Sequence, residues 1–168
     1  MFKILAVLSF LLFNFSFAQD LQGKITYNEQ SARKEAFSIS VSEIPKELFK
    51  EHLKDKYAKE NYINLKKKNC IITTSPERSL CPFYVLNTLA IYSVKYYDDF
   101  NKTYYYNILG HLVKFEIDDY SGSYPYRAIA YNTKGEVINI TLVVSNKESF
   151  VFDKNEKLIG HWFDENFF

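Results

Sequence analysis

Hydrophobic and polar positions alternate with a period of two along the second half of the chain. Val113, Phe115 and Ile117 lie on one side of an expected strand, and the same alternation returns over residues 138–144. This pattern is typical of antiparallel strands that bury one face. Turn-forming residues separate these segments at short intervals. From residue 103 onward we therefore expect a meander of consecutive strands.

A helical period follows a short expected strand at residues 36–41. Over residues 42–61 apolar side chains recur at the spacing of one helix face, and Ser42 is placed to cap the first turn. His52 lies beside this apolar stripe, where packing is favoured over metal binding. Residues 82–97 fit either a helix or a strand. The pattern predicts an α+β fold, with one main amphipathic helix packed on an antiparallel sheet.

The first eighteen residues have the pattern of a secretory signal. Lys3 precedes ten apolar residues at 4–13, and Ser16 and Ala18 supply the small side chains of a cleavage site. We therefore predict a signal peptide over residues 1–18 and a single domain over residues 19–168. No later segment reaches the roughly 20 apolar residues that a membrane span requires. We expect an exported protein, periplasmic or extracellular, without a transmembrane segment after signal cleavage.

Two cysteines, Cys70 and Cys81, flank a segment with the turn-forming pair Ser75–Pro76. Export permits a disulfide, and this turn can bring the two thiols together. A disulfide is therefore the favoured interpretation. A pair of free buried thiols remains open, and a catalytic cysteine is disfavoured because no histidine lies in a recognisable protease motif.

Composition narrows the function classes. The chain has 168 residues with 21 basic and 20 acidic side chains, a formal net charge of +1. This balance predicts no nucleic-acid partner and gives no footprint for an anionic membrane surface. Phosphate-loop, metalloprotease and hydrolase-elbow motifs are missing from the sequence, so we expect no cofactor. Residues 118–123 could offer oxygens to calcium, but their spacing favours a solvated turn, and no metal site is predicted.

Three segments share one turn pattern: an aromatic residue, Asn or Asp, two variable residues, Gly or Glu, one variable residue and two aliphatics. They are Tyr106–Val113, Tyr131–Ile138 and Phe152–Ile159. The Asn or Asp side chain caps the turn, and glycine supplies a positive φ before the next strand. The pattern resembles the YD-type and MORN-variant hairpin repeats of exported bacterial proteins, a resemblance that implies a scaffold or protein-contact surface.

Two further resemblances concern export. The Phe17–Ala18–Gln19 junction resembles the signals of exported proteins of Bacteroidota-type bacteria. The segment 106–114 is similar to the opening motif of type IX secretion sorting domains, which are β-sandwich tags. The later motif of those domains is missing here, and the chain ends in acidic and aromatic residues.

Tyrosines crowd the region between residues 96 and 126. Alternate side chains on a strand face opposite ways, so part of each cluster must face outward. Exposed tyrosine presents a large contact area with few rotatable bonds, which suits protein and glycan recognition. We therefore predict a non-enzymatic binding module for a protein, peptide or glycan. The candidate binding residues are Tyr104, Tyr106, Tyr124, Tyr126 and Trp162. The alternatives are a small secreted hydrolase and a sorting-like domain.

Overall fold

A computed structural model describes residues 27–65, 69–74, 76–163 and 166–167. The predicted signal peptide at 1–18 lies outside the described residues. Ten strands form one sheet, in the order β1 to β10. They are β1 (Ile71–Thr74), β2 (Glu77–Val85), β3 (Thr88–Tyr96), β4 (Lys102–Asn107), β5 (Leu112–Asp118), β6 (Tyr126–Tyr131), β7 (Val137–Ser145), β8 (Glu148–Asp153), β9 (Leu158–Phe163) and β10 (Asn166–Phe167).

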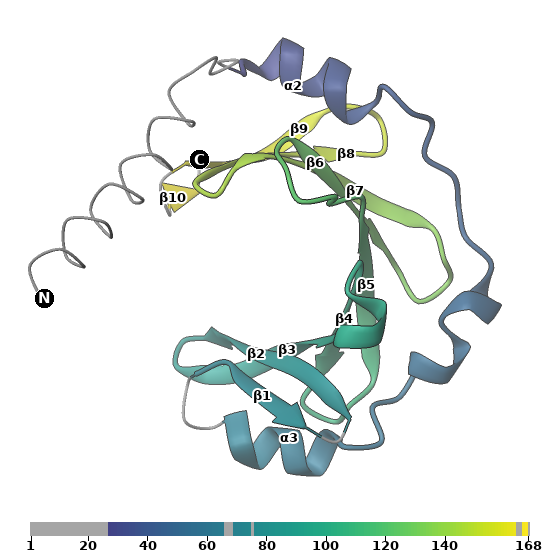
Figure 1. Ribbon diagram of the computed structural model, residues 1–168, viewed down its shortest axis with the longest axis vertical. Helices are drawn as coiled ribbons and strands as arrows, with labels where there is room; N and C mark the ends of the chain where they lie inside the picture. Colours follow the sequence, from purple (N-terminus) through teal and green to yellow (C-terminus); the bar gives the residue numbers. More distant parts are fainter. Residues whose placement is uncertain (1–26, 66–68, 75, 164–165, 168) are drawn as a thin grey trace, which may run out of the picture.

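Every neighbouring pair of strands is antiparallel, so the expected meander extends over the whole sheet. Residues 82–97, which fitted a helix or a strand, belong mainly to β2 and β3 and the tight turn between them. The sheet curves strongly, and in Figure 1 it has a convex outer side and a concave inner side.

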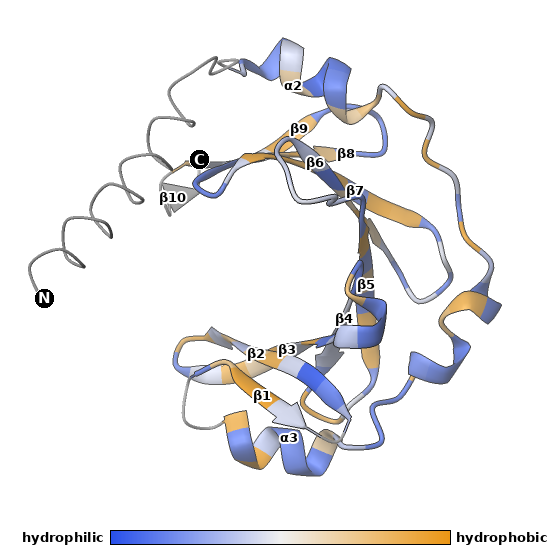
Figure 2. Cartoon of the chain, viewed as in Figure 1, coloured by the Kyte–Doolittle hydropathy of each residue, from blue (hydrophilic) through white to orange (hydrophobic). Residues whose placement is uncertain are grey.

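Residues 27–65, which we name the strap, follow the convex side of the sheet (Figure 1). The strap contains α2 (Glu29–Ala36), the 3-10 turns η1 (Lys46–Leu48) and η2 (Lys50–His52), and α3 (Ala58–Leu65). Another 3-10 turn, η3 (Tyr97–Asp99), joins β3 to β4. Figure 2 shows α2 as mostly hydrophilic, and only Ala32 and Ala36 are buried in it.

Two apolar cores lie between the strap and the convex face. One packs Ala32 and Ala36 of α2 against Leu142 and Phe150 of the C-terminal strands. The other packs the strap around Phe49 against the N-terminal strands; its buried members include Leu65, Leu80, Tyr92, Val94, Tyr104, Tyr106 and Phe115. The sheet is therefore buried on one face by a long, mostly irregular segment.

The predicted helix over 42–61 and the predicted strand at 36–41 are both wrong. Residues 36–41 hold the end of α2 and an irregular stretch, and residues 42–57 form two short 3-10 turns and loops before α3 begins at Ala58. The apolar spacing in this stretch serves contacts along the strap, because Ile44, Phe49 and Leu53 each pack on the sheet. Broadly, the α+β prediction is confirmed.

The three predicted turns have one geometry. In each, the side-chain oxygen of Asn107, Asn132 or Asp153 accepts hydrogen bonds from the backbone N–H groups two and four residues later. The fifth residue of the pattern, three after the Asn or Asp, has a positive φ in all three turns: Gly110 at 77°, Gly135 at 87° and Glu156 at 64°. The turn chemistry read from the sequence is thus confirmed.

A bulged residue follows each of these turns. The strand register skips Val113, Ile138 and Ile159, so that Leu112, Val137 and Leu158 pair with the aromatic residue before the turn. The predicted placement of Val113 and Ile138 on the buried face is therefore wrong, and both are partly exposed. A bulge inserts one extra residue and so reverses the alternation of side chains locally. A prediction based on a strict period of two does not include this reversal.

The strap is hydrogen-bonded to all three turns at the same position. The carbonyl of Gly110 accepts from Asp55 N at 2.8 Å, and that of Gly135 accepts from Ile44 N at 3.0 Å. The carbonyl of Glu156 accepts from the side chain of Arg33 at 2.9 Å. The first two contacts bring backbone against backbone, whereas the third uses a long side chain. This difference explains why glycine occupies only the first two turns.

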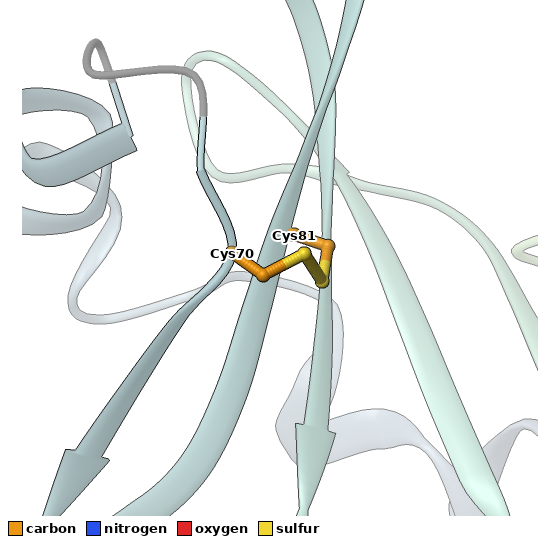
Figure 3. Close-up of a disulfide and its surroundings, with 2 residues drawn as sticks. All are labelled: Cys70 and Cys81. Atoms are coloured by element: carbon orange, nitrogen blue, oxygen red, sulfur yellow. A yellow bond between two sulfur atoms is a disulfide. The ribbon is translucent and has the colours of Figure 1, made fainter.

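Cys70 and Cys81 are bonded as a disulfide, as predicted. Figure 3 shows the bridge joining the residue just before β1 to β2. The register pairs Ile71 with Leu80, so the two cysteines follow as the next cross-strand neighbours. The bridge therefore fixes the edge hairpin of the sheet.

Candidate functional site on the concave face

The concave face of the sheet is defined by strand pairing. Paired residues on neighbouring antiparallel strands share a face, and successive residues alternate. Leu142 pairs with Phe150, and both are buried against the strap. The next pair, Val143 with Ser149, therefore belongs to the concave face. Both of these side chains are half-buried.

Three tyrosines form a cluster where the β5–β6 connection meets this face. The ring centroids of Tyr120 and Tyr126 lie 4.8 Å apart, and those of Tyr124 and Tyr126 lie 5.7 Å apart. Tyr124 is 45% exposed. Burial, together with the neighbouring Tyr124, raises the pKa of Tyr126. The connection is closed by an ion pair of 2.8 Å between Arg127 Nη2 and Asp119 Oδ2. These contacts hold the rings together as one surface.

Trp162 lies in the same cross-strand row as Tyr126, three strands away. The row runs Tyr126, Val143, Ser149, Trp162 over four strands. Three strand spacings make this distance about 14 Å. The next row consists of small or β-branched residues; it is Ala128, Thr141, Val151 and Gly160. Aromatic side chains thus flank a floor of small ones.

Two ion pairs lie on the β3–β5 part of the concave face. Lys95 Nζ is 3.3 Å from Asp118 Oδ2, and Lys114 Nζ is 2.7 Å from Glu116 Oε1. Tyr105 donates its hydroxyl hydrogen to Glu116 at 2.6 Å, and burial and that carboxylate raise the pKa of Tyr105. Each positive charge has its own carboxylate. These four charges cancel locally and leave polar groups suited to a neutral ligand.

The structure separates the five predicted binding residues. Tyr124, Tyr126 and Trp162 belong to the accessible side of the sheet, but Tyr104 and Tyr106 are each only 1% exposed. The surface placement of Tyr104 and Tyr106 is wrong, because the strap covers the convex face to which both point. Their neighbour Tyr105, which the prediction passed over, pairs with Ser93 and Lys114 on the concave face. Because side chains alternate along a strand, the consecutive residues 104–106 could not all face solvent, and the sequence already required some of these tyrosines to be buried.

A buried polar cluster lies between the strap and β2–β3. The Asp55 carboxylate accepts from Asn61 Nδ2 at 2.6 Å and from the Tyr92 hydroxyl at 2.7 Å, and lies 3.6 Å from Arg78 Nη1. The Arg78 guanidinium also stacks 4.3 Å above the Tyr57 ring. Asp55, Asn61 and Arg78 are each at most 5% exposed. We assign this cluster a structural role, because its charged and amide side chains are almost fully buried and are paired with one another.

A cavity of about 440 Å³ opens beside that cluster and includes His52, Asp98 and Asp99 in its lining. The His52 ring stacks on Tyr104 with centroids 4.1 Å apart, and burial lowers the pKa of His52. Asp99 is paired with Lys102 at 2.8 Å. Among the described residues lining this cavity there is no Ser, Thr or Cys. The cavity thus gathers acid and base groups, and the hydroxyl-bearing side chains in its described lining are Tyr57, Tyr96 and Tyr106.

The other two histidines lie apart from this cavity. His161 Nε2 is 3.0 Å from Glu148 Oε1, and its ring stacks on Phe150. His111 lies in the exposed turn before β5. Within the described ranges no group of three or more His, Cys, Asp or Glu side chains is placed to hold a metal ion.

No protein-family model matches this sequence, and comparisons with curated proteins and with solved structures give no significant match. The resemblances to hairpin repeats and to sorting domains therefore rest on the turn motifs alone. In the part of the chain that the structure describes, no helix is both long and apolar enough to cross a membrane.

Proposed function

We propose that this protein is a non-enzymatic binding module of the cell envelope, exported by residues 1–18, that holds a glycan, peptide or protein segment on its concave face. The observation that carries the proposal is the cluster of Tyr120, Tyr124 and Tyr126, three mutually contacting rings on an accessible surface. Aromatic rings held in place by their neighbours bind with little loss of side-chain entropy.

The surroundings of the cluster favour a neutral, extended ligand. Lys95 and Lys114 are each paired with a carboxylate, so a charged ligand would have to compete with existing ion pairs. The row of small or β-branched residues beside the row from Tyr126 to Trp162 leaves room for an extended ligand that crosses several strands. Rings at both ends of such a row offer stacking surfaces, and the paired polar groups offer hydrogen bonds to hydroxyl or amide groups.

The test is binding of the purified chain to arrayed envelope glycans and to an unbiased peptide array. Wild type is compared with Tyr124→Ala and Tyr126→Ala, and with Tyr97→Ala as a matched control. Tyr97 is an exposed tyrosine in η3, which belongs to the β3–β4 connection and not to the β5–β6 connection that carries the cluster. We expect the first two variants to lose the retained ligand and the control to keep it. Equal retention by all four proteins would contradict the proposal.

A small secreted hydrolase is the second candidate, favoured by the cavity that gathers His52 with Asp98 and Asp99. Such a site would use a water activated by these acid and base groups, because the described lining holds no Ser, Thr or Cys nucleophile. Turnover of an ester, amide or glycoside substrate that disappears in His52→Gln, with the fold intact by circular dichroism, would favour this candidate over the first.

A further inference from the structure

Four hairpin turns lie at one end of the strands, because every second connection of a meander falls on the same side. They join β2 to β3, β4 to β5, β6 to β7 and β8 to β9. The middle residues of these turns are Leu86–Asn87, Ile108–Leu109, Thr133–Lys134 and Lys154–Asn155. Two successive turns therefore carry aliphatic side chains at their tips, Leu86 in one and Ile108 and Leu109 in the other, whereas the other two tips have none.

The apolar tips are not required by the turns themselves. The turn at Asn107 has the same hydrogen bonds and the same positive φ as the turn at Asn132, yet Ile108 and Leu109 stand where Thr133 and Lys134 suffice. Leu109 is 67% exposed. Ile108 and Leu109 border α3 across a cavity, but large parts of both side chains stay exposed, and an external contact is the simplest explanation for those parts.

Leu86 is another exposed aliphatic residue that its turn does not require. It has a φ of 48°, a left-handed conformation that a bulky apolar residue rarely adopts, and it is 94% exposed. The position favours Asn, Asp or Gly in a two-residue hairpin turn. Val85 beside it is also exposed. The pairing of Ile91 with Asn107 makes β3 and β4 neighbours, and the β2–β3 tip projects beyond the Ile108–Leu109 tip, because Leu86 lies five residues past Ile91 and Leu109 only two past Asn107.

Three lysines lie near the Ile108–Leu109 tip. A cavity of about 820 Å³ lies between this tip and the start of α3, and its lining includes Lys54, Lys56 and Lys59 with Ile108 and Leu109. None of these lysines has an ion-pair partner among the described residues.

Asp55 is the one acidic residue in the described lining of this cavity. Its carboxylate already forms an ion pair with Arg78 and accepts hydrogen bonds from Asn61 and Tyr92. The described lining of this cavity therefore has more positive than negative side chains, although Lys54 and Lys56 also line the neighbouring cavity, which holds Glu51, Asp98 and Asp99.

We propose that this end of the sheet docks on an anionic lipid surface, with the Leu86 and Ile108–Leu109 tips inserted among the acyl chains. Lys54, Lys56 and Lys59 lie level with the phosphate groups. Exposed aliphatic side chains gain free energy on leaving water, and lysines close to an anionic surface add electrostatic attraction. Docking of this kind needs no membrane-spanning helix, and it goes beyond the ligand site on the concave face.

The experiment places a fluorescent reporter at each tip of the full chain. In a Trp162→Phe background, Leu109→Trp and Leu86→Trp each provide a single tryptophan, and Thr133→Trp is the matched control. Vesicles of phosphatidylglycerol and phosphatidylcholine carry a brominated acyl chain as quencher. We expect strong quenching and a blue-shifted emission at 109 and 86, and neither at 133. Because quenching is local, contact of residues 1–18 with lipid does not imitate it.

Two further comparisons make the outcome decisive. Vesicles of phosphatidylcholine alone, or a Lys54→Gln, Lys56→Gln and Lys59→Gln variant, should weaken binding by about tenfold or more, since roughly 1 kcal/mol is attributed to each lysine near such a surface. Absence of quenching at 109, equal quenching at 133, or binding indifferent to lipid charge would overturn the proposal. If binding did not depend on lipid charge, or if a protein partner covered the tips, the apolar tips would have a role other than docking on an anionic membrane.

Discussion

Gly135 offers a direct test of how the strap is held on the sheet. Its φ is 87°, and a Cβ built on it would lie 2.0 Å from the carbonyl oxygen of Ile44. Gly135→Ala must therefore push the strap away and break the hydrogen bond from Ile44 N to the Gly135 carbonyl. Gly122 is the matched control: its φ is 101°, but nothing lies within 4 Å of a Cβ built there.

The magnitudes separate the two variants. A left-handed φ costs a residue with a Cβ about 1–2 kcal/mol, partly offset by about 0.4–1 kcal/mol from the lower entropy of the unfolded chain. Gly122→Ala should therefore lower the free energy of unfolding by about 1 kcal/mol. Gly135→Ala adds a lost hydrogen bond of about 1 kcal/mol and a backbone shift of about 1–2 kcal/mol. We expect a loss of roughly 3 kcal/mol at that position.

Urea unfolding followed by circular dichroism measures both variants, with Glu156→Ala as a third protein. Glu156 already carries a Cβ at a φ of 64°, and the strap reaches its carbonyl through the Arg33 side chain. Glu156→Ala should therefore change the free energy of unfolding by less than about 0.5 kcal/mol. Equal losses in Gly135→Ala and Gly122→Ala would refute close backbone approach as the reason for glycine at this turn.

Three other predictions concern stability. Replacing Cys70 and Cys81 by serine should lower the free energy of unfolding by about 3 kcal/mol, measured by urea titration with and without reductant; an unchanged midpoint would contradict it. Asp55→Asn leaves Arg78 buried without its counter-ion and should cost about 3–5 kcal/mol in the same assay, whereas a loss below 1 kcal/mol would show the cluster to be accessible. The pKa of His52 is lowered by burial, so the unfolded chain takes up its proton first as pH falls below 6.5. Stability should then decrease with falling pH, and less steeply in His52→Gln, which is checked by melting curves across this range.

Local chemistry explains which parts of the fold the sequence predicts. The three turns depend on a side-chain oxygen and a positive φ within five residues, so Asn107, Asn132 and Asp153 identify them without any tertiary information. The antiparallel meander follows because the strands are consecutive and the connections are short. The disulfide is predictable for the same reason, since Cys70 and Cys81 are neighbours across a single hairpin.

The strap could not be predicted this way. Its apolar residues, among them Ile44, Phe49 and Leu53, have a spacing that a helix would also satisfy. Their actual partners are on strands far along the chain, and no local pattern reports those partners. The bulged positions Val113 and Ile138 were misplaced for a related reason, because a one-residue shift in pairing depends on the neighbouring strand.

From residue 103 onward, the sequence by itself determined the antiparallel strands, the turns between them and the alternation of side chains within each strand. Only the tertiary structure decided which side of that alternation faces inward. The strap packs on the convex face, so Tyr104 and Tyr106 are buried while Tyr105 points to the opposite side. Alternation divides a strand into two faces by geometry alone. Which face is buried depends on what covers the sheet, and here that cover is a segment distant in sequence.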